Sequence, residues 1–431
     1  MSFRTAIRGA AGAFLACALW AGQQDSFVIE HAAIHPVSGP EIPVGSVLVK
    51  DGKIEAVGAR VAARGVRVVE GKGLHVYPGM INSATLLGLS EISAIRETND
   101  TNEIGDFNPQ LSAEVAINPA SEHIPVTRAN GITTAIALPS AGGSPGMITG
   151  QAALIHLDGW TWAEMNVLRD AAVGLQFPSL DPPRRSFLAP PGGVTTPFRE
   201  VQRAYDERLR KLTKFFEDAR RYQTAKQGHA SGFETDLKFE AMIPVLEKKV
   251  PLLVLAPRER QMRAALDFAK KENVRVVLAG CRELGKLGPD IKAANVPVIL
   301  GPTLETPIEE DMPYDQAYAL PAAFFRAGIK FAFGTFDVQF ARNLPYEASM
   351  ASAFGLPKDE ALKSVTLNAA EIWGVADKFG SIEPGKSADL IITDGDPLET
   401  RTQVLRVFIA GKPVDLDNKH KRLYEKYMKR P

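Results

Sequence analysis

The middle of the chain alternates short apolar runs with amphipathic stretches at a nearly fixed spacing. Three strand-like runs, Val250–Leu255, Val274–Leu278 and Val296–Leu300, begin 24 and 22 residues apart. Helical patterns, Glu259–Lys271 and Glu283–Ala294, fill the intervals between them. A strand followed by a helix in each repeat places consecutive strands parallel in one sheet. The spacing therefore predicts an α/β fold with a parallel sheet.

The same alternation extends in both directions. Gly131–Leu138 and Ala153–Leu157 are strand-like, and the helical stretch Ala317–Ala327 precedes another strand-like run, Ile329–Gly334. The whole span, residues 78–378, has the length of a single barrel of eight strand–helix units with insertions. We therefore predict a (β/α)8 TIM-like barrel over residues 78–378.

Both ends of the chain have a different sequence pattern, in which short apolar runs are separated by turn residues. Asp51-Gly52 lies between two alternating runs in SVLVKDGKIEAVG, which is a strong hairpin signal. The same pattern occurs near the other end of the chain, in ADLIITDGDP and VLRVFIAGKPVD. We predict that residues 23–77 and 379–417 build one small composite β-sandwich domain from both termini. Residues 418–431 are predicted to form a charged C-terminal tail.

One stretch outside this alternation, Phe198–Gln227, has the apolar period of a single long amphipathic helix. Its apolar stripe consists of Val201, Tyr205, Leu209, Leu212, Phe216, Ala219 and Tyr222. We interpret it as a helix packed outside the barrel rather than a partner-binding helix. The proline-rich segment SLDPPRRSFLAPPGG before it is interpreted as an ordered loop or a lid hinge.

The N-terminus has the layout of a secretory signal. Arg4 and Arg8 precede an apolar run from about residue 9 to residue 20, which is too short for a stop-transfer helix. We predict a signal peptide over residues 1–22 and a periplasmic or secreted protein. A lipid anchor on Cys17 and a frayed N-terminal helix are the alternatives. No later segment predicts a membrane span.

The net charge of the chain limits the class of partner that it is expected to bind. The chain has 50 Lys+Arg and 50 Asp+Glu, so its formal net charge is zero. Because no overall positive field exists, we predict no nucleic-acid partner. The predicted partner is a small-molecule substrate or ligand, and the sequence leaves the oligomeric state open.

Three stretches carry a resemblance to a known family: VYPGMINSATLLGL, VILGPTL with FGTFDVQFARNLPYEA, and VTLNAAEIWGVADKFGSIEPGKSADLIITDGDP. Together they resemble the amidohydrolase superfamily, in its imidazolonepropionase-like branch. The resemblance implies a metal-dependent hydrolase of C–N bonds. It implies one or two divalent metals such as zinc at the C-terminal mouth of the barrel, where the metal lowers the pKa of a bound water.

The metal ligands that the resemblance implies are missing. The family's first-strand His-x-His falls on Ala84 and Leu86, and the eighth-strand Asp falls on Phe336, with Asp337 one residue later. The remaining matched positions are Asn82 for the first-strand Asp, Leu255 for the fifth-strand His and Ala279 for the sixth-strand His. The fourth-strand ligand has no evident counterpart. Since apolar side chains offer no lone pair, we predict no metal site and no bound cofactor.

The seven histidines do not replace these ligands. Four residues of extended chain separate His31 from His35 by roughly 13 Å, which is too far to share one zinc ion. The others, His75, His123, His156, His229 and His420, are predicted to be isolated surface or hydrogen-bonded residues. The acidic stretch RETNDTNEIGDF is interpreted as a solvated loop rather than a cation site.

Polar residues after the barrel strands are the remaining candidates, because ligands meet this fold there. Asp337 is the candidate catalytic general base, with a salt bridge to a nearby Arg as an equal alternative. Arg258 and Glu259, after the fifth strand, are candidate substrate-binding residues. Arg342 and Asn343, after the eighth strand, complete that set. The lone Cys281 is predicted to be a buried, inert thiol rather than a nucleophile.

Two functional hypotheses follow. The first is an exported amidohydrolase-like protein whose hydrolytic activity is metal-poor or lost. The alternative is a non-catalytic protein of the same fold that binds a small molecule or a partner. Because a fold alone does not establish a function, the side chains at the mouth must decide between them.

Overall fold

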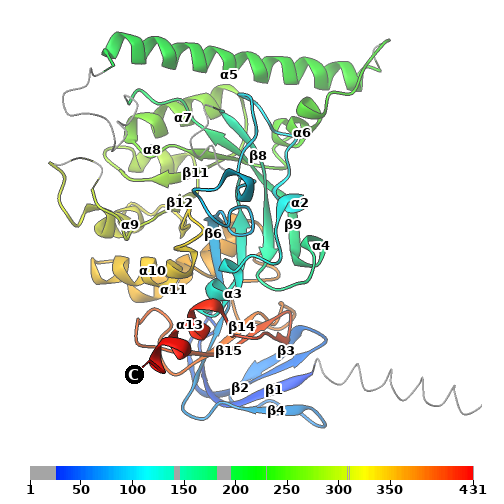
Figure 1. The fold of residues 1–431 in the computed structure, drawn as a ribbon, viewed down its shortest axis with the longest axis vertical. Helices are drawn as coiled ribbons and strands as arrows, with labels where there is room; N and C mark the ends of the chain where they lie inside the picture. The colour runs from blue at the N-terminus through cyan, green and yellow to red at the C-terminus, as the bar shows by residue number, and fades with distance from the viewer. Residues whose placement is uncertain are drawn as a thin grey trace, which may run out of the picture.

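The computed structural model describes residues 26–139, 146–181, 196–229, 231–307, 309 and 311–430. It contains two β-sheets of eight strands each, one in the strand–helix region and one built from the chain ends (Figure 1). The predicted signal peptide, including Cys17, and most of the proline-rich segment lie outside the described residues. No helix in the described ranges is both long and apolar enough to cross a membrane.

The first sheet is a nearly closed barrel. Its strands are β6 (Met80–Thr85), β7 (Ile132–Ala137), β8 (Ile148–His156), β9 (Asn166–Gln176), β10 (Leu252–Leu255), β11 (Val276–Cys281), β12 (Val298–Leu300) and β13 (Phe331–Phe333), hydrogen-bonded in that order. Closure involves the chain just after β13, where the backbone N–H of Phe336 donates to the carbonyl of Ala84, 2.8 Å away. The predicted TIM-like barrel is thus present.

One strand departs from the predicted all-parallel arrangement. β8 is antiparallel to both β7 and β9, while the other neighbouring pairs in the barrel are parallel. Only residues 138–147 separate β7 from β8, and only a short segment with the single turn α4 (Trp162–Met165) separates β8 from β9. Connections this short can join only antiparallel strands. The barrel therefore contains a hairpin where a regular (β/α)8 barrel has a crossover helix.

Helices surround the barrel. They are α2 (Ala113–Ala116), α3 (His123–Arg128), α5 (Phe198–Gln227), α6 (Leu237–Leu246), α7 (Glu259–Lys271), α8 (Gly288–Ala293), α9 (Gln316–Arg326), α10 (Leu344–Ala353), α11 (Lys358–Ser364) and α12 (Leu367–Ile372). As predicted, α5 packs outside the barrel, with Phe216 edge-on to Phe268 of α7 at 5.2 Å between ring centroids. α8 is shorter than predicted, because Gly285 takes a left-handed conformation with φ +52°.

The second sheet combines strands from both ends of the chain. Its members are β1 (Phe27–Ile34), β2 (Ile42–Lys50), β3 (Lys53–Gly58), β4 (Arg67–Glu70), β5 (His75–Pro78), β14 (Leu390–Thr393), β15 (Val404–Ile409) and β16 (Lys412–Pro413). β5 pairs with β14, and Phe27 stacks on Phe408 at 4.5 Å between ring centroids. β1 pairs with both β4 and β5, so hydrogen bonds connect all eight strands into one continuous sheet.

The β2–β3 hairpin follows its turn residues. Asp51 and Gly52 have φ angles of +50° and +76°, the left-handed conformation that a two-residue turn of this type requires. The register pairs Lys50 with Lys53 on either side of the turn. The predicted hairpin is therefore present.

A buried ion pair lies where the barrel meets the second sheet. Nε2 of His156, at the end of β8, lies 3.1 Å from Oδ2 of Asp389, just before β14. The other carboxylate oxygen of Asp389 accepts hydrogen bonds from the Ala410 N–H and the Ser387 hydroxyl. The His156 ring also meets Phe379 edge-on, at 5.6 Å. These contacts connect β8 to the C-terminal segment of the second sheet.

Candidate functional site

The barrel mouth is apolar at the positions where metal ligands were sought. Ala84 and Ala279 are fully buried in one hydrophobic cluster with strand residues from around the barrel, and Leu255 and Phe336 pack against this cluster. The wall is also tight here, since a Cβ added at Gly334 would lie 2.9 Å from the Ala84 Cβ. We call Ala84, Leu255, Ala279 and Phe336 the mouth cluster.

The donor set does not fit a metal ion. Across the described residues, no group of three or more His, Cys, Asp or Glu side chains is arranged to hold one. The sequence of the two longest internal gaps, 140–145 and 182–195, contains none of these residue types. Since zinc sites use three or four such donors, the mouth cluster cannot supply them.

Asn82, matched to a metal-binding Asp by resemblance, has a different role. It is fully buried, and its Nδ2 donates to the Thr335 hydroxyl at 2.8 Å. The Thr335 N–H in turn donates to Asn82 Oδ1 at 3.2 Å. This reciprocal pair connects β6 to the chain after β13. Its hydrogen-bonding groups are therefore used to close the barrel.

Asp337 lies beside the mouth, half-buried, directly after β13. Its carboxylate accepts a hydrogen bond from the Phe340 N–H at 2.7 Å, and its backbone carbonyl accepts one from the Thr85 hydroxyl at 2.6 Å. No basic side chain among the described residues pairs with it within 4.0 Å. The salt-bridge alternative therefore finds no support there, and a catalytic role for Asp337 stays a prediction.

Arg258 and Glu259 belong to a charged cluster at the loops after β10 and β11. Arg258 pairs with Asp181 at 3.1 Å, with Glu283 at 3.2 Å and also with Glu309. The Glu259 N–H donates to Glu283 at 2.9 Å. Burial lowers the pKa of Arg258, but the surrounding carboxylates outweigh it and leave the pKa raised. The guanidinium is thus already surrounded by acidic partners.

Arg342 and Asn343 do not join that cluster. They lie on the short turn η2 (Ala341–Asn343), where the Arg342 carbonyl accepts a hydrogen bond from Asn130 Nδ2 at 2.6 Å. Asn130 precedes β7, so this contact lies toward the end of the barrel opposite the mouth. The Arg342 guanidinium donates to the Gln339 carbonyl beside the Phe340 ring. The structure brings Arg258 and Glu259 together but leaves Arg342 and Asn343 in the outer layer.

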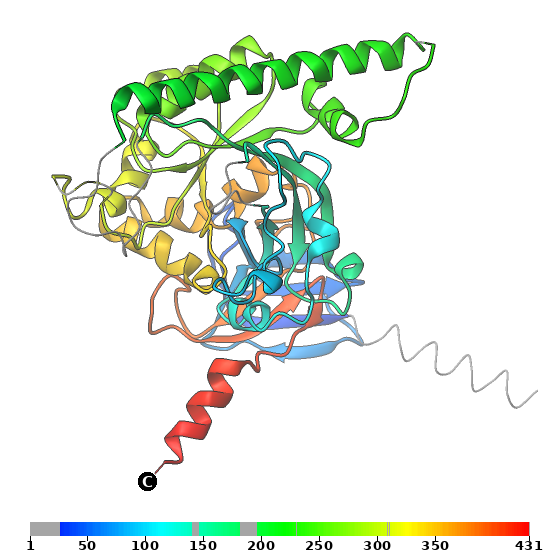
Figure 2. The same ribbon diagram turned by 45° about the horizontal axis from the view of Figure 1, so that its top comes forward.

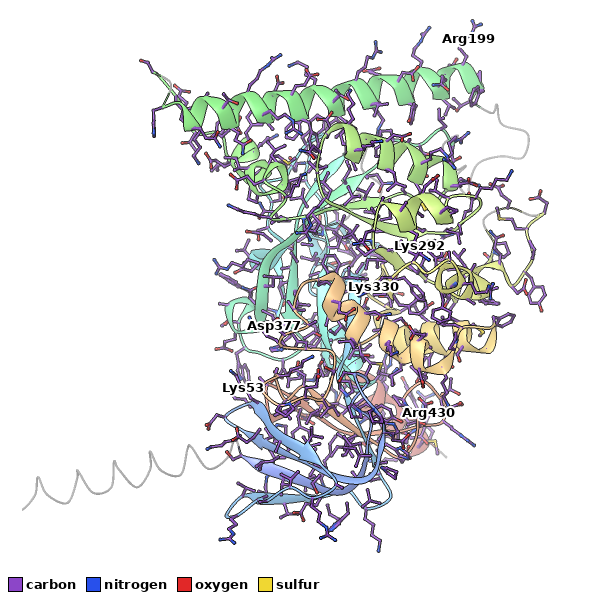
Figure 3. The ribbon with its side chains drawn as sticks, turned by 180° about the vertical axis from the view of Figure 1, so that it is seen from behind. Lys53, Arg199, Lys292, Lys330, Asp377 and Arg430 are labelled. Atoms are coloured by element: carbon purple, nitrogen blue, oxygen red, sulfur yellow. The ribbon has the colours of Figure 1, made fainter. Side chains whose placement is uncertain are left out.

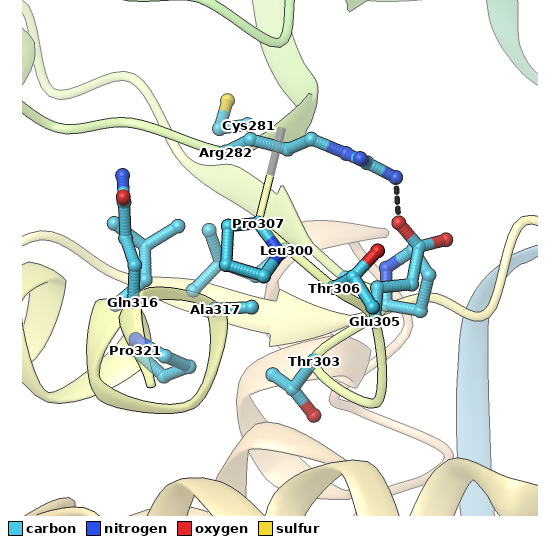
Figure 4. Close-up of a pocket in the computed structure, with 13 residues that line it drawn as sticks. Cys281, Arg282, Leu300, Thr303, Glu305, Thr306, Pro307, Gln316, Ala317 and Pro321 are labelled. Carbon is cyan, nitrogen blue, oxygen red and sulfur yellow. Dashed lines mark hydrogen bonds and ion pairs between the residues drawn. The ribbon is translucent and has the colours of Figure 1, made fainter. Parts of the chain in front are cut away.

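A small cavity lies beside the ends of β11 and β12. It is lined by residues including Cys281, Thr303 and Gln316, and the Arg282–Glu305 ion pair lies along it (Figure 4). Its volume of about 20 Å³ has room for about one water molecule. Burial raises the pKa of the Cys281 thiol. Cys281 is therefore buried and protonated, as expected of an inert thiol.

Sequence reasoning missed one buried carboxylate at this rim. Glu347 of α10 accepts hydrogen bonds from the Thr303 N–H, from the Thr303 hydroxyl at 2.5 Å and from the Leu304 N–H at 3.0 Å. Burial raises the pKa of Glu347 despite these donors. The contacts fix the loop after β12. A lone glutamate in the otherwise uncharged helix LPYEASMASA was the available signal.

Comparisons with known proteins agree on the family. A sequence profile of the amidohydrolase family matches residues 212–414. Amidohydrolase tasK of Hapsidospora irregularis is 23% identical over 416 residues, which are 88% of this chain and 41% of the relative. The chain thus spans about two fifths of that relative's length.

Two further matches sharpen the assignment. The imidazolonepropionase of Sphingopyxis alaskensis is 52% identical over 50 residues, covering 11% of this chain and 12% of that enzyme. A solved amidohydrolase from Thermotoga maritima aligns over 90% of this chain and 99% of its own, with 25% identity and a TM-score of 0.75. The chain is thus similar to a solved amidohydrolase structure over 90% of its length, and to the imidazolonepropionase-like branch of that superfamily over the short matched segment.

Proposed function

We propose that this chain derives from metal-dependent hydrolases of C–N bonds and has lost metal-dependent hydrolysis at its own barrel mouth. The observation that carries the proposal is the mouth cluster. Where the resemblance expects ligand side chains, two alanines, a leucine and a phenylalanine pack together instead. A metal-bound hydroxide placed there would lack donors to its ion and would be buried against apolar groups, at a high desolvation cost.

Any hydrolysis that remains must use groups other than a metal-bound water. Asp337 is the carboxylate nearest in sequence to the matched metal position Phe336. It would act as a general base toward a water molecule, at much lower efficiency than a metal-bound hydroxide. One oxygen of Asp337 already caps the following turn through Phe340. This engagement favours loss of catalysis over its survival.

Ligand binding without turnover is the second candidate function. The charged cluster around Arg258, together with the Arg282–Glu305 pair, lies at the ends of β10–β12. Substrates of barrel proteins bind at this end. Because the cluster combines guanidinium and carboxylate groups, it suits a polar small molecule carrying both charges. This binding site remains part of the proposal.

Metal content and chelation test the proposal together. Protein purified without added metal should contain far less than one zinc ion per chain by elemental analysis. Any hydrolysis of amide, cyclic amide or ester substrates should survive a strong chelator. Stoichiometric zinc, or an activity that chelation abolishes and zinc restores, would show that the proposal is wrong.

The variant Asp337→Asn separates the two remaining outcomes. Because asparagine keeps an oxygen acceptor for the Phe340 N–H, the fold should be unaffected. A chelator-resistant activity that disappears in this variant would establish metal-free catalysis, whereas an activity equal to wild type would exclude Asp337 as the base. Export through residues 1–22 is a further proposal, and the mass of the mature chain recovered from the periplasm or medium tests it.

A further inference from the structure

The last helix of the chain is exposed along its length. α13 (Lys419–Met428) has no buried residue, and it projects away from the second sheet (Figure 2). Its beginning is fixed, because the Asn418 side chain accepts hydrogen bonds from the N–H groups of His420 and Lys421. Arg422 then pairs with Asp417 at 2.8 Å and with Glu122 at 3.3 Å. The body of the protein therefore holds the first turn and leaves the remaining turns free.

An apolar stripe runs along the free part of α13. Leu423, Tyr424, Tyr427 and Met428 are 37%, 66%, 47% and 66% exposed. At about 100° per residue these four side chains fall within roughly 140° of the helix circumference. A contiguous apolar face left in water is unusual on a soluble protein and indicates a contact surface.

Basic residues occupy the rest of the circumference. Residues 419–430 contain six Lys and Arg and one acidic residue, Glu425. The basic residues are Lys419, Lys421, Arg422, Lys426, Lys429 and Arg430. The Arg430 guanidinium lies 4.3 Å from the Tyr427 ring centroid, so positive charge directly flanks the aromatic stripe. This strong local charge contrasts with the electroneutral chain as a whole.

We propose that α13 is a docking helix for the surface of an anionic phospholipid bilayer. A helix with Lys and Arg on one face and aromatic and aliphatic side chains on the other lies in the interface, with the apolar face among the acyl chains. The tyrosines suit the headgroup level, and each basic residue gains energy from the negative surface potential. A second copy of α13 is a poor occupant, because two such positive helices repel each other.

Vesicle sedimentation with the full chain tests the charge requirement. The protein should sediment with vesicles of phosphatidylglycerol and phosphatidylcholine at low salt, and not with phosphatidylcholine alone. The variant K421E/K426E/K429E should bind at least about tenfold more weakly. The matched control K53E/K72E/K412E, which makes the same charge change on exposed lysines of the second sheet, should bind like wild type. Absence of wild-type binding, or equal losses in both variants, would overturn the proposal.

The apolar stripe needs a separate test. In Tyr427→Trp, fluorescence should shift to shorter wavelength when phosphatidylglycerol vesicles are added, because the indole enters the interface. The variant Y424S/Y427S should lose vesicle binding while keeping the wild-type circular dichroism spectrum, since neither residue is buried. If ultracentrifugation instead shows a lipid-independent dimer that Y424S/Y427S dissociates, a second copy covers the stripe and the proposal is wrong. Binding to an acidic protein without vesicle binding would equally contradict it.

Discussion

The two ends of the barrel differ in the side chains that they bury. At the mouth, four positions matched to metal ligands, those of the mouth cluster, are apolar and pack together. At the opposite end, His156 and Asp389 form a buried ion pair between β8 and the terminal sheet. In a barrel enzyme the mouth carries the chemistry and the other end carries stability. Here a buried ion pair at that other end, His156–Asp389, connects the barrel to the second sheet, and we call this contact the joint.

The largest effect is expected from breaking that joint. Asp389→Ala should lower the free energy of unfolding by about 3–5 kcal/mol, because it leaves the buried His156 without its partner. Equilibrium denaturation in urea measures the change. Asp377→Ala, at an exposed position (Figure 3), is the control and should cost less than about 0.5 kcal/mol. Equal effects of the two substitutions would contradict a special role for the joint.

A substitution in the mouth cluster should come next in size. Ala84→His should destabilise the protein by about 2–3 kcal/mol, because a polar ring must enter a tightly packed apolar site beside Gly334. Urea denaturation again gives the value, and Ala293→His on the exposed side of α8 is the control. If zinc restored the stability of Ala84→His, the mouth would still be able to coordinate an ion. The inferred difference between the mouth and the opposite end of the barrel would then be wrong.

The smallest effect is the contribution of the joint to the pH dependence of stability. Burial lowers the pKa of His156, but the Asp389 carboxylate outweighs it, so the pKa stays above the ordinary 6.5. Burial raises the pKa of Asp389, but His156 and the neighbouring donors hold it below the ordinary 3.8.

The sign of the pH effect follows from these two shifts. The stabilisation is complete between the two ordinary values and is lost as the pH rises from 6.5 through the folded pKa of His156. It is also lost as the pH falls from 3.8 through the folded pKa of Asp389. The slope cannot exceed about 1.4 kcal/mol per pH unit for one proton. Urea denaturation between pH 6 and pH 9 should show the alkaline loss, and His156→Gln should remove it. A slope unchanged in that variant would assign the effect to other groups.

Local patterns predicted local structure well. Phe198–Gln227 and Glu259–Lys271 are helices with the predicted ends. Both have apolar residues that recur with the helical period over a long stretch, a pattern that indicates an amphipathic helix and not a strand. The direction of β8 was not predictable in this way, since an apolar strand has the same pattern in either orientation.

At the candidate site, the sequence showed which residue types are present, but not which residues contact one another. The apolar side chains at Ala84 and Ala279 follow directly from the sequence. His156 was predicted to be isolated, yet it pairs with Asp389, more than two hundred residues away. His35 and His75 were likewise treated separately, although pairing of β1 with β5 places His35 Nε2 2.9 Å from His75 Nδ1. Contacts between distant segments depend on the closed fold, which no short window of sequence contains.

The pairing of β5 with β14 has a consequence for biosynthesis. Pro78 and Leu390 are partners in register, so a growing chain must add roughly 310 residues after β5 before that strand meets β14. One edge of β5 therefore stays unpaired while the ribosome synthesises the barrel, although β1–β4 already have partners nearby in the chain. Chaperones that shield nascent strands, or a translocation pathway that keeps the chain extended, would protect this protein most during that interval.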